Sequence, residues 1–440
     1  MKTPLYDALL NYKANTRLHT PGHKGHLQGI FSEIAPYDVT ELSFTDDLYN
    51  PKGVILEAER LACNFFETKT TVFSAGGASL CIQTALSFFQ GKKVLFDRNS
   101  HKSAFNAANL LDIEPLFIYN DIDDIFGIPL PVTAEMITVF LKQSKAVSAV
   151  FITSPNYFGL YSDIKAIKNV CEKCNVVLIV DNAHGTHLYM TDKENSAQKN
   201  ADIIIDSAHK TLPVLTGGAF LHFNNNISYS DIKSHISLFG STSPSFLILA
   251  SLDYARGWCV RHGIDEFGLT EQRVEALREI IEKAGFLTIK KKFYDKTRIT
   301  ISTIFNDIDG YFLATELEKE KIIPEMADKN NVVILFSPFN DLSEYEDIKS
   351  FFKNRNFKNS DKCINFSKIP QTIFKTKMKT AYFGQNEIVQ IQAAVGRIAA
   401  ESIVPYPPGV PVLLPGELIT EDLTQYLQIN HNVDSLKVIL

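Results

Sequence analysis

Short apolar runs alternate with helical patterns from residue 70 to residue 206 of this chain. The runs are TTVFS, KKVLFD, EPLFIY, AVSAVFIT, VVLIVD and ADIIID. The segments between them have helical periodicity and include SLCIQTALSFF, HKSAFNAANLL, AEMITVFLKQS and DIKAIKNVCEKC. Strands that alternate with helices predict an α/β fold, with a mostly parallel sheet sandwiched by helices. Ligands bind such sheets beyond the carboxyl ends of the strands, so the residues that follow each strand are the candidates for function.

The alternating region lies inside a chain of 440 residues, which is long enough for two or three domains. We expect a leader segment over residues 1–48, a large domain over 49–283 and a smaller C-terminal α+β domain over 284–440. Pro and Gly residues predict that the leader is irregular. A long helix is predicted from Pro244, with this proline in its first turn, and a second helix over EQRVEALREIIEKAG leads out of the sheet domain.

The overall composition excludes several classes of function. Apolar residues make up 45% of the chain and charged residues 21%, as in ordinary globular proteins, and the formal net charge is −6. No basic block is present, so we expect neither a nucleic-acid partner nor binding to a membrane surface. No apolar run has the length of a membrane span, and the N-terminus lacks the apolar core of a signal peptide.

The cysteines and histidines predict no metal site. The six cysteines have no spacing typical of a disulfide framework: Cys63, Cys81, Cys171, Cys174, Cys259 and Cys363. Cys171 and Cys174 form a CxxC inside a predicted helix, but no second pair of ligands accompanies them. His19, His23 and His26 have no set of carboxylates or thiols beside them in the sequence. Unpatterned cysteines without a signal peptide predict a reducing, cytoplasmic location.

A glycine-rich turn follows the first predicted strand. Residues Ser74 to Ser79 read SAGGAS and lead into a helix that we expect to start near Leu80. Backbone N–H groups at a helix start, together with a serine hydroxyl, can hold a phosphate. The turn matches neither a Walker A loop nor GxGxxG. It predicts either a phosphate cradle or a simple N-cap.

Two other strands are followed by residues suited to a flat, charged cofactor. His101 stands at the start of the helix after the second strand, where an imidazole can stack on a flat ring or cap the helix. Asp181 ends an all-apolar strand, and a carboxylate there is costly unless it is paired. A protonated pyridine nitrogen is a suitable partner for it.

Lys210 follows the last of these strands, on a turn with Ser207 and His209. A lysine at this place can hold a carbonyl cofactor as a Schiff base, and Gly217–Gly218 allow close backbone approach. The alternative is an ordinary surface lysine. A phosphate cradle, a stacking ring, a strand-end aspartate and a Schiff-base lysine along one sheet edge together predict pyridoxal 5'-phosphate (PLP).

Strings spread over nearly the whole chain resemble the Orn/Lys/Arg decarboxylases: HTPGHKG, DDLYNPKG, DRNSHKS, DNAHGTH, SAHKTLPVLTGGAFLH, STSPSFLILASLD and YPPGVPVLLPGE. The resemblance implies the aspartate-aminotransferase-like fold of PLP-dependent enzymes (fold type I), in a short form without the N-terminal receiver-like domain of the long members. It implies a PLP-dependent amino acid decarboxylase that converts lysine, arginine or ornithine to a polyamine-type amine and CO2.

The resemblance also implies the roles of single residues. Lys210 is the implied Schiff-base residue, Asp181 the partner of the pyridine nitrogen and His101 the ring stacked on the cofactor, while His209 or Lys210 returns a proton to Cα. The implied cofactor-binding set is Gly77, Ala78, Ser79, His101, Asp181, Ala183, His184, Ser207, His209, Lys210, Ser241 and Thr242. In this family the turn at 242–245 reaches the phosphate of the neighbouring subunit. A homodimer with shared active sites is therefore the smallest active unit implied, and larger assemblies stay open.

Two positions depart from the family pattern. Asn182 stands where members often carry an acidic residue, and Gly217–Gly218 stand where a bulkier polar residue is frequent. Both changes can reshape the substrate pocket. A pocket disabled in this way would leave a PLP-binding protein without catalysis, which is one alternative to a decarboxylase.

The reaction and the substrate depend on charged residues elsewhere. An aminotransferase would hold the substrate carboxylate with an arginine, and Arg397 is the candidate, with a helix-surface ion pair as the alternative. A basic substrate needs an acid at its far end. The candidates are Asp46, Asp47 and Glu417, each of which can instead be a solvated loop carboxylate. The proline-rich loop 405–415 is stiff enough to form a pocket wall.

Overall fold

The computed structural model describes residues 2–12, 16–144, 146–358, 360, 366, 368–405 and 409–440. Cys363 and the centre of the proline-rich loop, 406–408, lie outside the described residues. The chain forms two compact units, each built from separate stretches of sequence. The first unit comprises Met1–Phe88, Asp163–Thr270 and Ser337–Phe339, and the second comprises Phe89–Ser162, Glu271–Phe336 and Asn340–Leu440. The domain boundaries expected at residues 48 and 283 stay predictions.

The first unit contains four strands of the α/β region, in the order β1-β7-β6-β5. β5 and β6 are parallel, whereas β7 is antiparallel to both of its neighbours, β6 and β1. The strands are β1 (Thr70–Ser74), β5 (Val177–Asp181), β6 (Ile203–Asp206) and β7 (Ala219–Phe223). The helices are α1 (Pro4–Leu10), α2 (Val54–Phe66), α3 (Gly77–Ser87), α6 (Ile164–Lys173), α7 (Leu188–Thr191), α8 (Ala197–Asn200), α9 (Tyr229–Ser237), α10 (Phe246–Trp258) and the start of α11 (Ile264–Lys283).

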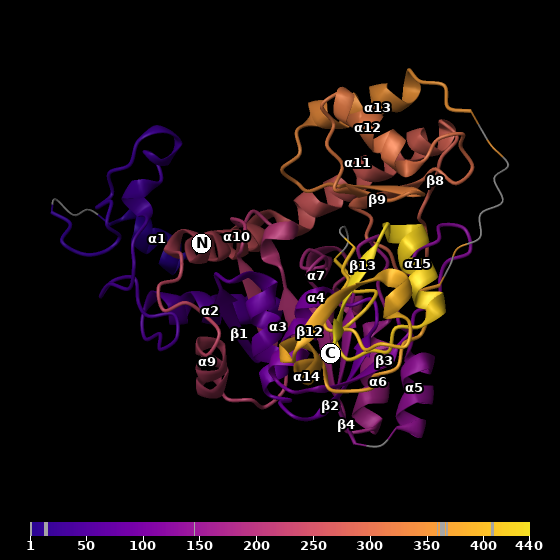
Figure 1. The fold of residues 1–440 in the computed structure, drawn as a ribbon. Helices are drawn as coiled ribbons and strands as arrows, with labels where there is room; N and C mark the ends of the chain where they lie inside the picture. The colour runs from indigo at the N-terminus through magenta and orange to yellow at the C-terminus, as the bar shows by residue number, and fades with distance from the viewer. Residues whose placement is uncertain are drawn as a thin grey trace. The chain divides into compact units, whose positions relative to one another are not determined.

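The second unit contains three parallel strands in the order β4-β2-β3, and two smaller antiparallel sheets, β10-β11-β9-β8 and β12-β13. Figure 1 shows α12 and α13 covering the sheet that contains β8 and β9. The strands are β2 (Lys93–Asp97), β3 (Glu114–Ile118), β4 (Val147–Thr153), β8 (Leu287–Thr288), β9 (Arg298–Ser302), β10 (Met326–Ala327), β11 (Asn331–Leu335), β12 (Asn386–Gln390) and β13 (Ser435–Ile439). The helices are α4 (Lys102–Leu110), α5 (Ala134–Gln143), α12 (Gly310–Lys319), α13 (Leu342–Lys353), α14 (Met378–Phe383) and α15 (Glu421–His431), with the rest of α11.

The core of the first unit follows directly from the residue pattern. The strands β5 and β6 are buried along their whole length, except at the first residue of β5, which suits runs of Ile, Leu and Val in a sheet covered on both faces. On α2 the buried positions Ile55, Ala58, Ala62 and Phe66 recur every three or four residues and form one helix face. That face packs with α10 and β1 in a common apolar cluster. Every predicted strand between residues 70 and 206 is present, and the mixed α/β fold is confirmed.

Two expectations about local structure are wrong. The leader is not irregular throughout, because α1 forms at its start and lies beside α10 (Figure 1). The buried Asp253 carboxylate on α10 accepts a hydrogen bond from Leu5 N–H at 2.9 Å, a tertiary contact that local sequence does not reveal. Pro244 is not in a first helical turn, because Ser245 is the N-cap of α10 and accepts a hydrogen bond from Ile248 N–H. None of the helices within the described part of the chain has the length and apolarity to cross a membrane.

Candidate functional site

The carboxyl ends of β5 and β6 bring several predicted site residues together. Asp181 is the last residue of β5, and it pairs in parallel register with Ile205 of β6. Lys210 follows β6 on a single 3-10 turn, Ala208–Lys210. The Lys210 Nζ and the His184 Nε2 are 2.9 Å apart. Two neighbouring parallel strands thus place the predicted Schiff-base lysine beside the segment that follows the predicted partner of the ring nitrogen.

Asp181 is a buried carboxylate with a raised proton affinity. Its side chain accepts a hydrogen bond from Ala183 N–H at 3.2 Å, and the residue is 2% exposed. Burial raises the pKa of Asp181 to about 6, although the nearby Lys210 charge opposes this and Asp206 adds to it. A positively charged group beside this carboxylate would recover the free energy that its ionised form loses on burial.

His209 lies next to Lys210 and faces the glycine pair. Its Nδ1 is 3.2 Å from the Gly218 carbonyl oxygen and 3.4 Å from Ser207 Oγ. Burial lowers the pKa of His209, so its neutral form is favoured at pH 7. A neutral imidazole close to a lysine amine is suited to proton transfer.

The predicted phosphate cradle forms the first turn of α3, which begins at Gly77 rather than near Leu80. Its N-cap is Gly76, and no N-cap side chain bonds to the helix. Gly77 has a positive φ of 69°, and its N–H donates to the Gly217 carbonyl oxygen at 2.8 Å. The loop after Lys210 is therefore attached to the cradle through its glycine pair. Ala78 and Ser79 lie on the same first turn, at the N-terminus of the helix, where the helix dipole favours an anion.

A buried polar network, which was not predicted from the sequence, includes Asn182, the residue after Asp181. Asp206 ends β6 and is 0% exposed. Its Oδ1 accepts a hydrogen bond from Asn182 Nδ2 at 2.6 Å, and its Oδ2 lies 2.7 Å from Gln198 Nε2 and 3.0 Å from His222 Nε2. At position 182, where the family resemblance implies an acidic residue, the side chain is an amide that donates to the Asp206 carboxylate. The aspartate at the end of the predicted strand ADIIID is the sequence feature from which this network could have been predicted.

This geometry predicts that the protein tolerates an amide at one of positions 182 and 206 and a carboxylate at the other, in either order, but not a carboxylate at both. In an Asn182→Asp variant a second carboxylate would face Asp206 in a buried site, and we expect a loss of roughly 3 kcal/mol of stability. The double variant Asn182→Asp, Asp206→Asn restores one donor and one acceptor, so most of that loss should return. Urea unfolding at pH 7 measures both. A double variant no more stable than the single one would contradict this account.

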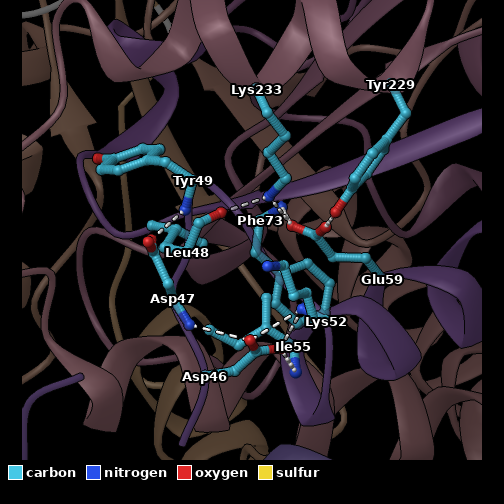
Figure 2. Close-up of polar contacts among 10 residues, drawn as sticks. All are labelled: Asp46, Asp47, Leu48, Tyr49, Lys52, Ile55, Glu59, Phe73, Tyr229 and Lys233. Atoms are coloured by element: carbon cyan, nitrogen blue, oxygen red, sulfur yellow. Dashed lines mark hydrogen bonds and ion pairs between the residues drawn. The ribbon is translucent and has the colours of Figure 1, made fainter. Parts of the chain in front are cut away.

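The remaining first-unit candidates lie on two connected segments. Asp46 has a positive φ of 75°, and its carboxylate accepts hydrogen bonds from the backbone N–H groups of Lys52 and Ile55 (Figure 2). It also accepts the N–H of Gly53, so it caps α2. Asp47 is exposed, and its Oδ1 accepts a hydrogen bond from the backbone N–H of the next residue but one at 2.8 Å. Ser241 and Thr242 are also exposed, in the loop before α10.

Three candidates belong to the second unit. His101 is the N-cap of α4, where its Nδ1 accepts a hydrogen bond from Ser103 N–H at 3.3 Å, so the capping interpretation is confirmed. Arg397 donates to Glu387 Oε1 at 2.8 Å and to the Ile439 carbonyl at 2.6 Å, which confirms an ion pair but not a helical position.

Glu417 is not a solvated loop carboxylate, because it is 0% exposed. Its Oε2 lies 3.7 Å from Arg98 Nη2 and accepts a hydrogen bond from Leu414 N–H at 2.7 Å, and its Oε1 accepts one from Thr372 Oγ1 at 2.5 Å. Burial raises the pKa of Glu417. Both oxygens of the Glu417 carboxylate therefore already have partners within the protein.

Known proteins resemble this chain in sequence and in fold. The family model of the Orn/Lys/Arg decarboxylase major domain matches residues 3–299, and that of the C-terminal domain matches residues 362–436. An arginine decarboxylase of Halalkalibacterium halodurans is 30% identical, over 98% of this chain and 94% of its own length. The Francisella novicida lysine decarboxylase structure has a TM-score of 0.85 at 18% identity, and the match covers 100% of this chain and 81% of that one. A structure of SPT with PLP has a TM-score of 0.56 at 13% identity, over 71% of this chain and 80% of that one.

The structural likenesses confirm the predicted fold type I of PLP-dependent enzymes, with a smaller C-terminal domain. The family-model match extends over well more than half of the chain, and it includes every first-unit candidate described above. The strings that suggested the resemblance lie in both matched regions. The chain belongs to the Orn/Lys/Arg decarboxylase family.

Proposed function

We propose that this protein removes CO2 from a basic amino acid (lysine, arginine or ornithine) with pyridoxal 5'-phosphate as its cofactor, and yields the corresponding polyamine-type amine. The observation that carries the proposal is the placement of Asp181 at the end of β5 and of Lys210 just after the adjacent parallel strand β6. Relatives named arginine decarboxylase and lysine decarboxylase support the substrate class. An SPT structure with PLP supports the cofactor for this fold.

The first-unit residues fit this cofactor. Asp181 is a buried acid whose ionised form would be stabilised by a protonated ring nitrogen. The first turn of α3, with Gly77, Ala78 and Ser79, lies at a helix N-terminus without a side-chain N-cap and suits a phosphate. The Lys210 amine would hold the aldehyde, and Ser207 would lie near the phosphate together with His209. In the second unit, His101 remains the proposed stacking ring.

Each of these side chains has a defined task. PLP, when bound, withdraws electrons from the substrate Cα and weakens its bond to the carboxylate group. Asp181 keeps the ring nitrogen protonated, and His184 orients the Lys210 amine through their 2.9 Å contact. His209, which burial keeps neutral, or Lys210 returns the proton to Cα. Ala183 donates its N–H to Asp181 and so fixes the carboxylate.

The contacts of the charged candidate residues help to choose between decarboxylation and transamination, and between the acids that could bind the basic end of the substrate. Arg397 is bonded to Glu387 and to a backbone carbonyl, which does not favour its use as the carboxylate grip of an aminotransferase. Glu417 and Asp46 are committed to bonds within the chain. Asp47 is exposed and accepts a single backbone N–H from a later residue, so it is the proposed acid for the far end of a basic substrate.

The working enzyme is proposed to be a cytoplasmic homodimer in polyamine metabolism. The exposed turn with Ser241 and Thr242 would reach the phosphate in the neighbouring subunit, as the family resemblance implies. Each active site would then contain residues of two chains.

The test is a product assay with purified protein loaded with PLP. CO2 and the matching amine are expected from at least one of lysine, arginine and ornithine, measured by trapped carbonate and chromatography. Leucine, which has no basic end, serves as the control substrate and should give none. Keto-acid formation without CO2 would favour an aminotransferase. Neither product from any of the three would favour a PLP-binding protein without catalysis.

A further inference from the structure

A fully buried ion pair lies in the first unit, outside the residues assigned above. Lys233 of α9 is 3% exposed and Glu59 of α2 is 1% exposed, and the Lys233 Nζ lies 2.7 Å from the Glu59 Oε1 (Figure 2). Burying two charges carries a large desolvation cost, and a well-packed apolar pair is often at least as stable. The pair is therefore weak evidence for stability, and its other bonds indicate its role.

Those other bonds lead to two of the segments assigned to ligand binding. The Glu59 Oε1 also accepts the N–H of Phe73 at 2.8 Å, one residue before the phosphate cradle begins at Ser74. The Lys233 Nζ also donates to the carbonyl oxygen of Leu48 at 2.8 Å, one residue after Asp47. The second Glu59 oxygen accepts the Tyr229 hydroxyl at 2.5 Å, so both charged groups are well bonded (Figure 2).

A third segment is attached through Tyr49, which follows Leu48. The Tyr49 hydroxyl donates to the Ser241 carbonyl oxygen at 2.9 Å, immediately before Thr242. The two chain segments fit closely here, because a Cβ on Gly240 would lie 1.9 Å from that hydroxyl. Only glycine at position 240 leaves room for the contact.

We propose that Lys233, Glu59 and Tyr49 are positioning residues that hold the cradle, the Asp47 segment and the Ser241 turn in fixed relation to one another. They act through backbone groups and touch neither cofactor nor substrate. This inference rests on the proposed function, because that function assigns the three segments to the phosphate and to the basic end of the substrate. The single polar cluster would thus set both cofactor affinity and substrate affinity.

The decisive variant removes both charges together, as Lys233→Met with Glu59→Gln. The glutamine still accepts from Phe73 N–H and can bond to Tyr229, so the main loss is the hold on the Leu48 carbonyl. Since one such hydrogen bond is worth on the order of tenfold in an equilibrium, we expect KM for the basic amino acid to rise about tenfold. The Kd of cofactor-free protein for PLP should rise up to about fivefold, because the segment freed at Leu48 also carries Tyr49, which holds the Ser241 turn. The value of kcat should change less than about threefold.

A matched control is another buried acid–base pair, Asp253 and Arg256 of α10, which are 0% and 2% exposed. Their side chains are 2.5 Å apart and bond to the backbone of Leu5 and Lys2 near α1, away from the three segments. Asp253→Asn with Arg256→Met should lower Tm without changing KM or the Kd for PLP. This control separates general loss of stability from loss of positioning.

A milder variant tests the third segment. Tyr49→Phe removes only the hydroxyl that reaches Ser241, so Tm should stay nearly constant while the Kd for PLP rises about fivefold. Hydrogen exchange of the amides at 44–53 in cofactor-free protein gives a readout independent of catalysis. It should speed up in the Lys233→Met, Glu59→Gln protein and not in the control.

Two results would overturn the inference. One is a Lys233→Met, Glu59→Gln protein that loses Tm as the control does but keeps wild-type KM and Kd for PLP. The other is unchanged exchange over 44–53 in that protein. If wild-type protein releases no CO2 from any basic amino acid, the proposed function fails, while the Kd for PLP and the exchange rates still test the positioning role.

Discussion

A Lys210→Ala variant is expected to release CO2 at least about 10³-fold more slowly than wild type from whichever basic amino acid wild type accepts. The reason is that Lys210 supplies both the amine that holds the cofactor aldehyde and one of the two candidate groups for proton return. The visible absorbance of lysine-bound PLP should disappear from the same protein. Both are measured on purified protein incubated with PLP.

Lys193→Ala is the control for this loss. Lys193 lies in the same unit but pairs with Glu67 at the surface, 2.6 Å away, so its removal should leave both the rate and the absorbance unchanged. A Lys210→Ala protein that keeps the visible band, or that keeps more than a tenth of the rate, would show that another group holds the aldehyde.

An Asp181→Asn variant is expected to have opposite effects on catalysis and on stability. With PLP bound, the rate of CO2 release should fall about 10²- to 10³-fold, because the ring nitrogen loses the charge that keeps it protonated. Without PLP, the variant should be more stable than wild type at pH 7. Burial raises the pKa of Asp181 from 3.8 to about 6, and a shift of that size corresponds to about 3 kcal/mol.

The direction with pH follows from the raised pKa. In cofactor-free wild type, the stability that comes from protonated Asp181 is fully present below about pH 4 and is lost as pH rises through about 6. Asparagine does not ionise, so the advantage of the variant should grow over this window and level off above it. Thermal unfolding of both proteins from pH 4 to pH 8 measures the difference.

Burial also raises the pKa of Asp97 to about 6, but Asp97 is present in both proteins, so its contribution cancels when the two stabilities are subtracted. A constant difference in Tm across the window would contradict the assignment.

Much of the fold and part of the site could be predicted because their signals are local. The run VLIVD gives a strand by its apolar residues and a strand-end acid by its last one, and the structure has both. The run IIID followed by SAHK places Lys210 in the same way. Parallel pairing of two such strands then brings their ends to one sheet edge without further information.

The rest depended on contacts between residues far apart in the sequence. Glu59 and Lys233 are separated by 174 positions, and α9 alone reads as an ordinary polar surface helix. Glu417 was predicted to be either a substrate-binding acid or a solvated loop carboxylate, but it is fully buried beside Arg98, which follows β2. From the sequence, Asn182 was only a departure from the family pattern, and its role as a hydrogen-bond donor to Asp206 is visible only in the structure.

The cap that Asp46 provides for α2 restricts how the substrate preference of this protein can be redesigned. Its carboxylate accepts N–H groups from the chain entering that helix, in a backbone conformation that most side chains avoid. In a library that randomises both Asp46 and Asp47, most members would therefore misfold because they lack the aspartate at position 46. Screens for a new amino acid specificity should vary Asp47 and keep its neighbour fixed.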